Sequence, residues 1–393
     1  MTQPQTLSVR RHLRRLISLA SLTLLILFCL SLSGCGSDSD GGNPENNLFV
    51  YKKYEDYFAI GAAVDSQTFR THEALLTAHF NSVTPENEMK FESSQRNEGE
   101  FLSSWSDKIV NFAAENEMRV RGHALIWHRQ TPAWVFQDGD GPASKALLLQ
   151  RMKSHIDWML THFKGKVDEW DVVNEAIMDD GSYRTGEEEQ DDQKSKWFEI
   201  LGESYIAEAF RYAHAADPDV KLFYNDYYNY LPARHQAIYE MLKGLLEANV
   251  PVHGVGLQCH LNIEPSSDST HQAYYQTVEN LETAIALYAS LGLEVAITEM
   301  DVSLYVPGVI YAPEDFYTQD TFTEALASKQ SDRYRTFFEM FRRHRDVITS
   351  VTLWGVADDS TWLSEFDSGR KDFPLLFDDD HQPKPAFDGI MQF

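Results

Sequence analysis

Two glutamates each stand where a short apolar run of the sequence turns polar. Glu175 follows the run 170–173 and Asn174, and Glu299 follows the run 295–298. They are 299 − 175 = 124 residues apart, so only the fold can bring them together. Two carboxyl groups that face each other across a cleft, one protonated and the other ionised, are the groups that cleave glycosidic bonds. The pair therefore predicts a glycosidase-type site, although a single glutamate in such a place is more often a solvated acid or a salt-bridge partner.

Other polar and aromatic side chains stand at the ends of further apolar runs. Packing does not explain them, because a parallel barrel needs only apolar side chains in its interior layers. Indole rings can stack on the flat C–H faces of sugars, while amides, lysine and carboxylates bond hydroxyl groups. We therefore predict one site around the two glutamates, built from Glu86, Asn87, Lys90, His123, Trp127, His128, Asn174, Asn225, Asp226, Gln258, His260, Asp301 and Trp354.

Eight short apolar runs alternate along the chain with longer segments of helical periodicity. The runs are 58–64, 80–84, 120–127, 170–173, 222–224, 255–261, 295–298 and 351–356. The segments between them include 145–163, 205–214, 233–246, 274–291 and 333–341, with apolar residues at three- and four-residue spacing. This alternation indicates parallel strands that are buried on both faces. The predicted fold class is α/β, a single (β/α)8 TIM barrel, in which functional groups lie at the carboxyl ends of the strands.

The first 47 residues differ in composition from the rest of the chain. Residues 1–34 combine a basic start with an apolar stretch, the pattern of a signal peptide. The ending Leu32-Ser33-Gly34-Cys35 resembles a bacterial lipobox, so we expect Cys35 to be acylated; the alternative is an uncleaved signal-anchor helix. Residues 35–47 are predicted to be a flexible Gly/Ser/Asp tether, and residues 48–393 to be one catalytic domain. The protein is therefore expected to be exported and lipid-anchored in the cell envelope, at the outer membrane or the cell surface.

Charge and cysteine content limit the possible partners. The chain carries 34 Lys and Arg against 60 Asp and Glu, a formal net charge of −26. Such an acidic surface repels phosphate backbones, so no nucleic-acid partner is expected. Of the three cysteines, only Cys259 lies in the predicted domain, which excludes a disulfide within that domain. We expect Cys259 to be buried, with its side chain directed away from the site.

Five segments at the strand ends resemble the signature segments of glycoside hydrolase family 10 endo-β-1,4-xylanases. They are 81–90 (NSVTPENEMK), 122–128 (GHALIWH), 170–176 (WDVVNEA), 256–260 (GLQCH) and 297–301 (ITEMD). Trp362 and the segments 353–356 (LWGV) and 374–378 (PLLFD) complete the order. The resemblance extends from about residue 58 to residue 387 and covers every predicted strand.

The resemblance implies a role for each matching residue. Glu175 would be the general acid/base and Glu299 the nucleophile of a retaining double displacement, with their carboxyl groups about 5 to 5.5 Å apart. His260 would bond Glu299 and be held by Asp301, and Asn174 would contact the 2-hydroxyl of the sugar being cleaved. The substrate-binding residues implied are Glu86, Asn87, Lys90, His123, Trp127, Gln258, Trp354 and Trp362.

The resemblance also implies partners and one backbone feature. Xylan and xylo-oligosaccharides are the expected substrates, and the protein is expected to be monomeric and to contact a membrane through its lipid anchor only. The chemistry needs no metal ion and no organic cofactor. The peptide bond between His123 and Ala124 is expected to be cis.

Two other functions fit the same residues less well. A β-glycanase acting on cellulose or mixed-linkage glucan would have to accommodate a hydroxymethyl group near Trp354, Trp362 and Lys90. A glycan-capturing lipoprotein without hydrolytic activity would need neither Glu175 nor Glu299.

Two loops depart from the family pattern, the acidic insert 187–192 and the long segment 306–323. Both are expected to border the cleft, and they leave open the leaving-group subsites and the preferred decoration of xylan.

Overall fold

The computed structural model describes residues 48–366 and 370–393. The predicted signal peptide (1–34), the lipidation site Cys35 and the tether (35–47) lie outside these residues. The described residues form one compact unit. None of the helices in the described ranges combines the length and the apolar composition that a membrane span needs.

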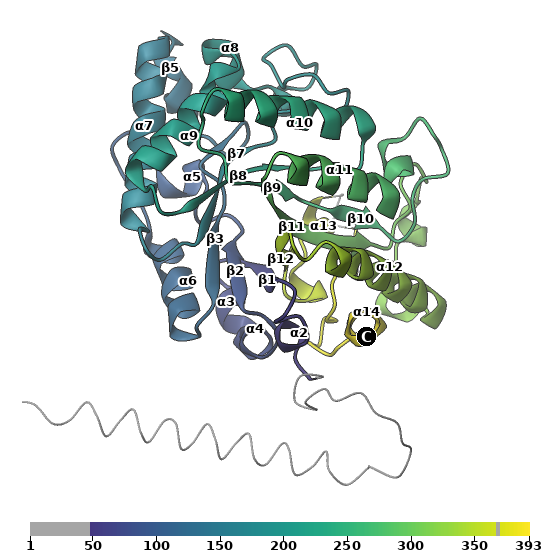
Figure 1. Ribbon diagram of the computed structural model, residues 1–393. Helices are drawn as coiled ribbons and strands as arrows, with labels where there is room; N and C mark the ends of the chain where they lie inside the picture. The colour runs from purple at the N-terminus through teal and green to yellow at the C-terminus, as the bar shows by residue number, and fades with distance from the viewer. Residues whose placement is uncertain (1–47, 367–369) are drawn as a thin grey trace, which may run out of the picture. The chain divides into compact units, whose positions relative to one another are not determined.

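Eight parallel strands close into a barrel, which confirms the predicted fold (Figure 1). In barrel order they are β1 (Ala59–Val64), β2 (Ser82–Pro85), β3 (Arg119–Gly122), β7 (Glu169–Asn174), β8 (Lys221–Asp226), β9 (Gly254–Leu257), β11 (Glu294–Ser303) and β12 (Ile348–Leu353). β12 pairs with β1, with Ala59 opposite Ser350, and this pairing closes the ring. Two short strands, β4 (Ile126–Trp127) and β10 (His260–Asn262), follow β3 and β9 in the chain and pair with β7 and β11, respectively.

Helices surround the barrel and link each strand to the next (Figure 1). The longer ones are α4 (Glu73–His79), α6 (Ser104–Glu115), α7 (Lys145–His162), α9 (Ser204–Ala216), α10 (Pro232–Glu247), α11 (Val278–Ser290), α12 (Glu324–Arg343) and α14 (Pro385–Met391). Short helices are α2 (Val50–Lys53), α3 (Thr68–Thr71), α5 (Phe91–Ser94), α8 (Lys196–Leu201) and α13 (Leu363–Phe366). The hydroxyl of Tyr54, just after α2, donates to the carbonyl of Ile390 in α14 at 2.6 Å, which ties the two ends of the domain together.

The local sequence explains where several of these elements begin and why they stay together. The side chains of Ser144 and Thr277 accept hydrogen bonds from Leu147 N and Asn280 N, and so cap the first turns of α7 and α11. All residues of β1 and β7 are buried, as expected for parallel strands covered on both faces. The apolar side chains of the strands and the inner faces of the helices form one continuous core.

The structure differs from the predicted elements in several places. β11 continues to Ser303, beyond the predicted run 295–298, and β12 spans Ile348–Leu353 where the predicted run was 351–356. The run 120–127 is interrupted at His123–Ala124, whose peptide bond is cis as the resemblance implies, and pairing resumes only at β4. The run 255–261 is interrupted at Cys259, which has a φ of 61°. The helix predicted at 333–341 is only the last part of α12, which begins at Glu324. Of residues 324–332, only Ala327 and Gln330 are buried, so this part lacks the apolar spacing used for the prediction.

Candidate active site

The barrel contains a wide cleft of about 1420 Å³ at the carboxyl ends of its strands. It is lined by the thirteen side chains for which a role in catalysis or sugar binding was predicted, whereas His128, Asn225 and Asp226, also predicted at the site, are not among its lining residues. The thirteen are Glu86, Asn87, Lys90, His123, Trp127, Asn174, Glu175, Gln258, His260, Glu299, Asp301, Trp354 and Trp362. Glu175 follows β7 directly and Glu299 lies in β11, with β8 and β9 between those two strands. The barrel therefore brings both glutamates into one site.

Glu299 is buried and lies against a histidine that a second carboxylate holds. Its Oε1 accepts a hydrogen bond from Asn225 Nδ2 at 2.8 Å, and its Oε2 is 3.3 Å from His260 Nε2. The other ring nitrogen of His260 is 2.9 Å from Asp301 Oδ2, which also accepts from Trp362 Nε1 at 2.9 Å. The Asp301–His260 pair therefore fixes the orientation of the Glu299 carboxylate.

Electrostatics favour the ionised form of Glu299. Burial alone would lower the pKa of His260, but the carboxylates of Asp301 and Glu299 outweigh burial and raise that pKa to about 10. Burial alone would raise the pKa of Glu299. The hydrogen bond from His260 and the charge of His123 outweigh it, so the pKa of Glu299 lies below its ordinary value.

Replacing His260 with asparagine is expected to move the acidic limb of the pH profile of kcat/KM to higher pH by about one unit. The reason is that the cation that lowers the pKa of Glu299 is lost. The measurement is hydrolysis of a soluble xylo-oligosaccharide across the pH range. His162→Asn is the matched control, because His162 pairs with Asp107 and does not line the cleft. An unchanged acidic limb in His260→Asn would contradict this assignment.

Glu175 has neutral partners. Its Oε2 accepts from Trp127 Nε1 at 2.9 Å, and its Oε1 accepts from Asn174 Nδ2 at 3.1 Å and from Gln258 Nε2 at 3.0 Å. His128 Nδ1 lies 4.0 Å from Oε2, and burial lowers the pKa of His128 to about 2, so this ring is neutral as well. The two glutamates thus differ in that Glu299, unlike Glu175, contacts an imidazole whose pKa is raised.

The backbone of Glu175 is held in an uncommon conformation. Its φ of 60° lies in the left-handed region, which costs about 1–3 kcal/mol for a residue other than glycine. Two contacts fix this turn: Glu175 N donates to Asn225 O at 2.9 Å, and Arg184 Nε donates to Glu175 O at 2.9 Å. The turn places the carboxyl group of Glu175 in the cleft just after β7 ends.

Asn225, at the end of β8, connects the surroundings of the two glutamates. Its Nδ2 donates to Glu299 Oε1 at 2.8 Å and to Asn174 Oδ1 at 2.9 Å, while Thr298 Oγ1 donates to its Oδ1 at 2.7 Å. The sequence predicted Asn225 as part of the site but assigned it no individual role. The available sequence signal for such a role was that Asn225 is polar and directly follows a buried apolar run.

A second group of side chains lies beside the glutamates. Lys90 Nζ donates to Asn87 Oδ1 at 3.1 Å and lies 4.9 Å from the ring centroid of Trp127. Burial lowers the pKa of Lys90, and the carboxylates of Glu86, Glu299 and Glu175 oppose this shift. The group therefore offers an ammonium, an amide and an indole face, which together suit one sugar ring.

His123 is oriented by a residue that sequence analysis did not select. Its Nδ1 is 2.9 Å from Asp171 Oδ2, and Arg121 Nη2 donates to Asp171 Oδ1 at 2.6 Å. The His123 ring meets Trp354 edge to face, with ring centroids 5.4 Å apart. Asp171 lies inside the apolar run of β7, where a buried acid signals a structural or orienting role.

The whole barrel matches one protein family. The family model described as glycosyl hydrolase family 10 matches residues 50–393. This chain belongs to glycosyl hydrolase family 10. A match of this extent includes every strand of the barrel and every residue that the sequence predicted in the cleft.

Several characterised relatives resemble this family 10 chain over most of its length. An endo-1,4-beta-xylanase of Geobacillus stearothermophilus is 42% identical over 334 residues, which cover 84% of this chain and 94% of the relative. Endo-1,4-beta-xylanase A of Caldicellulosiruptor saccharolyticus is 43% identical over 352 residues, which cover 88% and 96%. A solved structure of a glutamate-to-alanine mutant in complex with xylotriose is 43% identical, with a TM-score of 0.78, and covers 88% of this chain and all of that one.

Both unusual loops of this family 10 enzyme reach the cleft. Glu187, Glu188 and Glu189 of the acidic insert line it, as do residues 306–309 at the start of the long segment. Arg129 Nη2, itself at the cleft, bonds Asp192 at 2.5 Å and so ties the insert to the barrel. Tyr305 packs against Tyr311 and Tyr317 of the other loop.

Cys259 is buried and lies outside the cleft lining, as the sequence predicted. Burial raises the pKa of its thiol. A protonated, inaccessible thiol is a packing group.

Proposed function

We propose that this family 10 enzyme is an endo-β-1,4-xylanase that acts with retention of anomeric configuration. Glu299 is the nucleophile and Glu175 the general acid/base. The observation that carries this assignment is the contrast between the two carboxyl groups: Glu299 is bonded to His260, whose pKa is raised to about 10, whereas neutral donors surround Glu175. A carboxylate kept ionised by an imidazole, beside a second carboxyl group that has neutral partners, suits double displacement.

The reaction proceeds in two steps. A carboxylate oxygen of Glu299 bonds to the anomeric carbon while the bond to the leaving oxygen breaks, and Glu175 gives its proton to that oxygen. A xylosyl ester of Glu299 results. Water then attacks the anomeric carbon, Glu175 takes the proton of that water, and the ester bond breaks to restore the Glu299 carboxylate. Asn174, which Asn225 holds, contacts the 2-hydroxyl of the sugar, where hydrogen bonds strengthen in the transition state.

The remaining cleft residues bind the chain of xylose units. Glu86, Asn87 and Lys90 bond the hydroxyl groups of the sugar on the non-reducing side of the cleaved bond. Trp127, Trp354 and Trp362 provide flat apolar surface, and His123 and Gln258 complete the subsite. His260 and Asp301 act through Glu299 as positioning residues. The contacts of Lys90 with Asn87 and with the Trp127 ring support this division of roles.

The test of the substrate is a comparison of reducing ends released from xylan and from carboxymethylcellulose. We expect turnover on xylan to exceed turnover on the glucan by at least about tenfold, because an additional hydroxymethyl group must fit beside Trp354, Trp362 and Lys90. Faster turnover of the glucan would assign the enzyme to cellulose or mixed-linkage glucan instead. Binding of xylo-oligosaccharides without any turnover would favour a capture protein.

We also infer that the protein is exported and anchored through an acylated Cys35, after removal of residues 1–34. The basic start, the apolar stretch and the sequence Leu32-Ser33-Gly34-Cys35 support this inference. In its native host, the wild-type protein is expected to incorporate labelled palmitate and to enter the detergent phase of a Triton X-114 extract. Cys35→Ala should do neither, whereas Cys29→Ala, altered within the removed segment, should behave like the wild type. Equal labelling of wild type and Cys35→Ala would refute the anchor.

The catalytic domain is proposed to act as a monomer and to reach its substrate from the outer membrane or the cell surface, with residues 35–47 as the tether. Light scattering of the detergent-solubilised protein, corrected for bound detergent, should give the mass of one chain. A mass of two chains would refute this proposal.

A further inference from the structure

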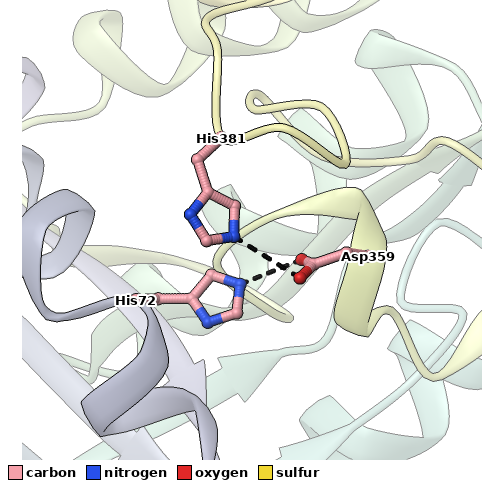
Figure 2. A group of neighbouring side chains, drawn as sticks. All are labelled: His72, Asp359 and His381. Atoms are coloured by element: carbon pink, nitrogen blue, oxygen red, sulfur yellow. Dashed lines mark hydrogen bonds and ion pairs between the residues drawn. The ribbon is translucent and has the colours of Figure 1, made fainter.

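Two histidines and one aspartate meet outside the catalytic cleft. His72 lies between α3 and α4, Asp359 lies in the 3₁₀ turn Asp358–Ser360 after β12, and His381 lies in the turn before α14. Figure 2 shows both imidazole rings with a nitrogen turned toward the carboxylate of Asp359. The distances are 2.9 Å from His72 Nε2 to Asp359 Oδ1 and 3.4 Å from His381 Nε2 to Asp359 Oδ2. None of the three residues lines the cleft.

We propose that His72, Asp359 and His381 bind a divalent transition-metal ion, with Zn²⁺ as the best fit. One ligand atom from each residue lies within 4.8 Å of the other two. Zn²⁺ takes imidazole nitrogen and carboxylate oxygen at about 2.0–2.2 Å, so atoms bound to one ion lie about 3.3–3.5 Å apart. The site would close if the partly exposed side chains of Asp359 and His381 rotated toward His72.

The donor set selects the class of metal. Two imidazoles and one carboxylate suit Zn²⁺ and its first-row neighbours, whereas Ca²⁺ and Mg²⁺ require six or more oxygen ligands, or several bound waters. Three protein ligands leave a coordination position for water, and the partly exposed Asp359 and His381 leave that position open to solvent.

His72 is already oriented for binding. Its side chain is buried, and its Nδ1 lies 2.8 Å from Thr71 Oγ1. Without an ion, Nε2–H donates to Asp359 Oδ1 and Nδ1 accepts from the Thr71 hydroxyl. An ion would replace the hydrogen on Nε2, and Nδ1–H would then donate to Thr71 Oγ1. A hydrogen bond on the other ring nitrogen is the usual support of a metal-binding histidine.

The turn that carries His381 is acidic and is held by hydrogen bonds to Asp378. Asp378 Oδ1 accepts from Gln382 N at 2.8 Å and from Asp380 N at 2.9 Å, and the chain runs Asp378-Asp379-Asp380 directly before His381. His381 itself has a φ of 61°. The local carboxylates and the net charge of −26 favour the approach of a cation.

A bound ion would connect the first and last parts of the barrel. β12 and β1 are paired, and the three ligands come from the segment after β1, the loop after β12 and the C-terminal turn. The neighbouring Asp358 is buried and accepts from Lys384 Nζ at 2.8 Å and Leu375 N at 2.8 Å. Three residues beyond Asp359, Trp362 donates to Asp301 in the active site. The ion is therefore structural. It stabilises the part of the barrel where β12 pairs with β1, together with the loop that carries Trp362, and it takes no part in the chemistry of Glu175 and Glu299.

The test uses the purified full chain without a histidine tag, freed of metal by EDTA and dialysis. Titration with zinc chloride should show one equivalent bound with a micromolar Kd, and saturating zinc should raise Tm by about 3 °C. His381→Asn should weaken zinc binding at least tenfold and remove the shift in Tm. Asparagine is chosen because it tolerates a positive φ and keeps the turn. Asp359→Asn should have the same effect.

His162→Asn is the matched control, because His162 pairs with one carboxylate, Asp107, and belongs to no such cluster among the described residues. This variant should keep the zinc affinity and the shift in Tm of the wild type. Absence of stoichiometric zinc binding by the wild type would overturn the proposal. So would equal zinc affinity of the His381→Asn and wild-type proteins, because the ion would then lie elsewhere.

Discussion

Replacing Glu299 with glutamine is expected to lower kcat on xylan by about 10⁵-fold, the order seen when a covalent nucleophile is removed. Glutamine keeps the size of the side chain but cannot form the xylosyl ester. Binding of xylotriose, measured by calorimetry, should change little, because Glu299 acts on the anomeric carbon rather than as the main hydroxyl contact. The thermal melt of the variant should show whether the buried contact with His260 still supports the fold.

The matched control for this variant is Glu294→Gln. Glu294 lies at the start of the same strand, β11, where it pairs with Lys221 at the end of the barrel remote from the cleft. Its replacement should leave kcat unchanged. If Glu299→Gln retained more than about one hundredth of wild-type kcat on xylan, Glu299 would not be the nucleophile.

Replacing Glu175 with alanine is expected to reduce the rate on xylan by about 10³-fold, the contribution of a general acid. The loss should depend on the leaving group. Formation of the xylosyl ester from 2,4-dinitrophenyl xylobioside should slow by less than about tenfold, because that leaving group needs no proton. Pre-steady-state release of dinitrophenol measures this step directly, and the basic limb of the pH profile should disappear.

Added azide distinguishes the general acid/base from the nucleophile by the anomeric configuration of the azide product. In Glu175→Ala, azide should attack the ester on Glu299 and give the β-xylobiosyl azide. In Glu299→Ala, azide should take the place of the nucleophile and give the α-azide. An equal loss of rate for Glu175→Ala on xylan and on the dinitrophenyl substrate would exclude Glu175 as the acid.

The strands and the glutamates were predictable from local sequence. Residues 295–298 form one of eight short runs that alternate with segments of helical periodicity, and this alternation indicates a buried parallel strand. The point where Glu299 follows that run marks the carboxyl end, and the fold class assigns function to that end. The breaks in two runs were less predictable, because they depend on the cis bond at His123–Ala124 and on the positive φ of Cys259.

Contacts between side chains on different strands could not be predicted from the local sequence. Asn225 bridges Asn174 and Glu299 across the barrel only because β8 lies in register beside β7, with Asn174 opposite Asn225. Asp171, which orients His123, also acts across two strands. The cluster of His72, Asp359 and His381 is the clearest case, because nothing in the spacing of residues 72, 359 and 381 marks them as neighbours. Tertiary structure alone brings them together.

The central claim is that Glu299 bonds to the anomeric carbon of a xylosyl unit while Glu175 transfers the proton. The most direct test is to inactivate the enzyme with a 2-deoxy-2-fluoro-xylobioside that carries a good leaving group, and to map the labelled peptide by mass spectrometry. We predict one sugar per chain, attached to Glu299. A label on any other residue, or products of xylan hydrolysis first released as the α-anomer, would contradict the assignment.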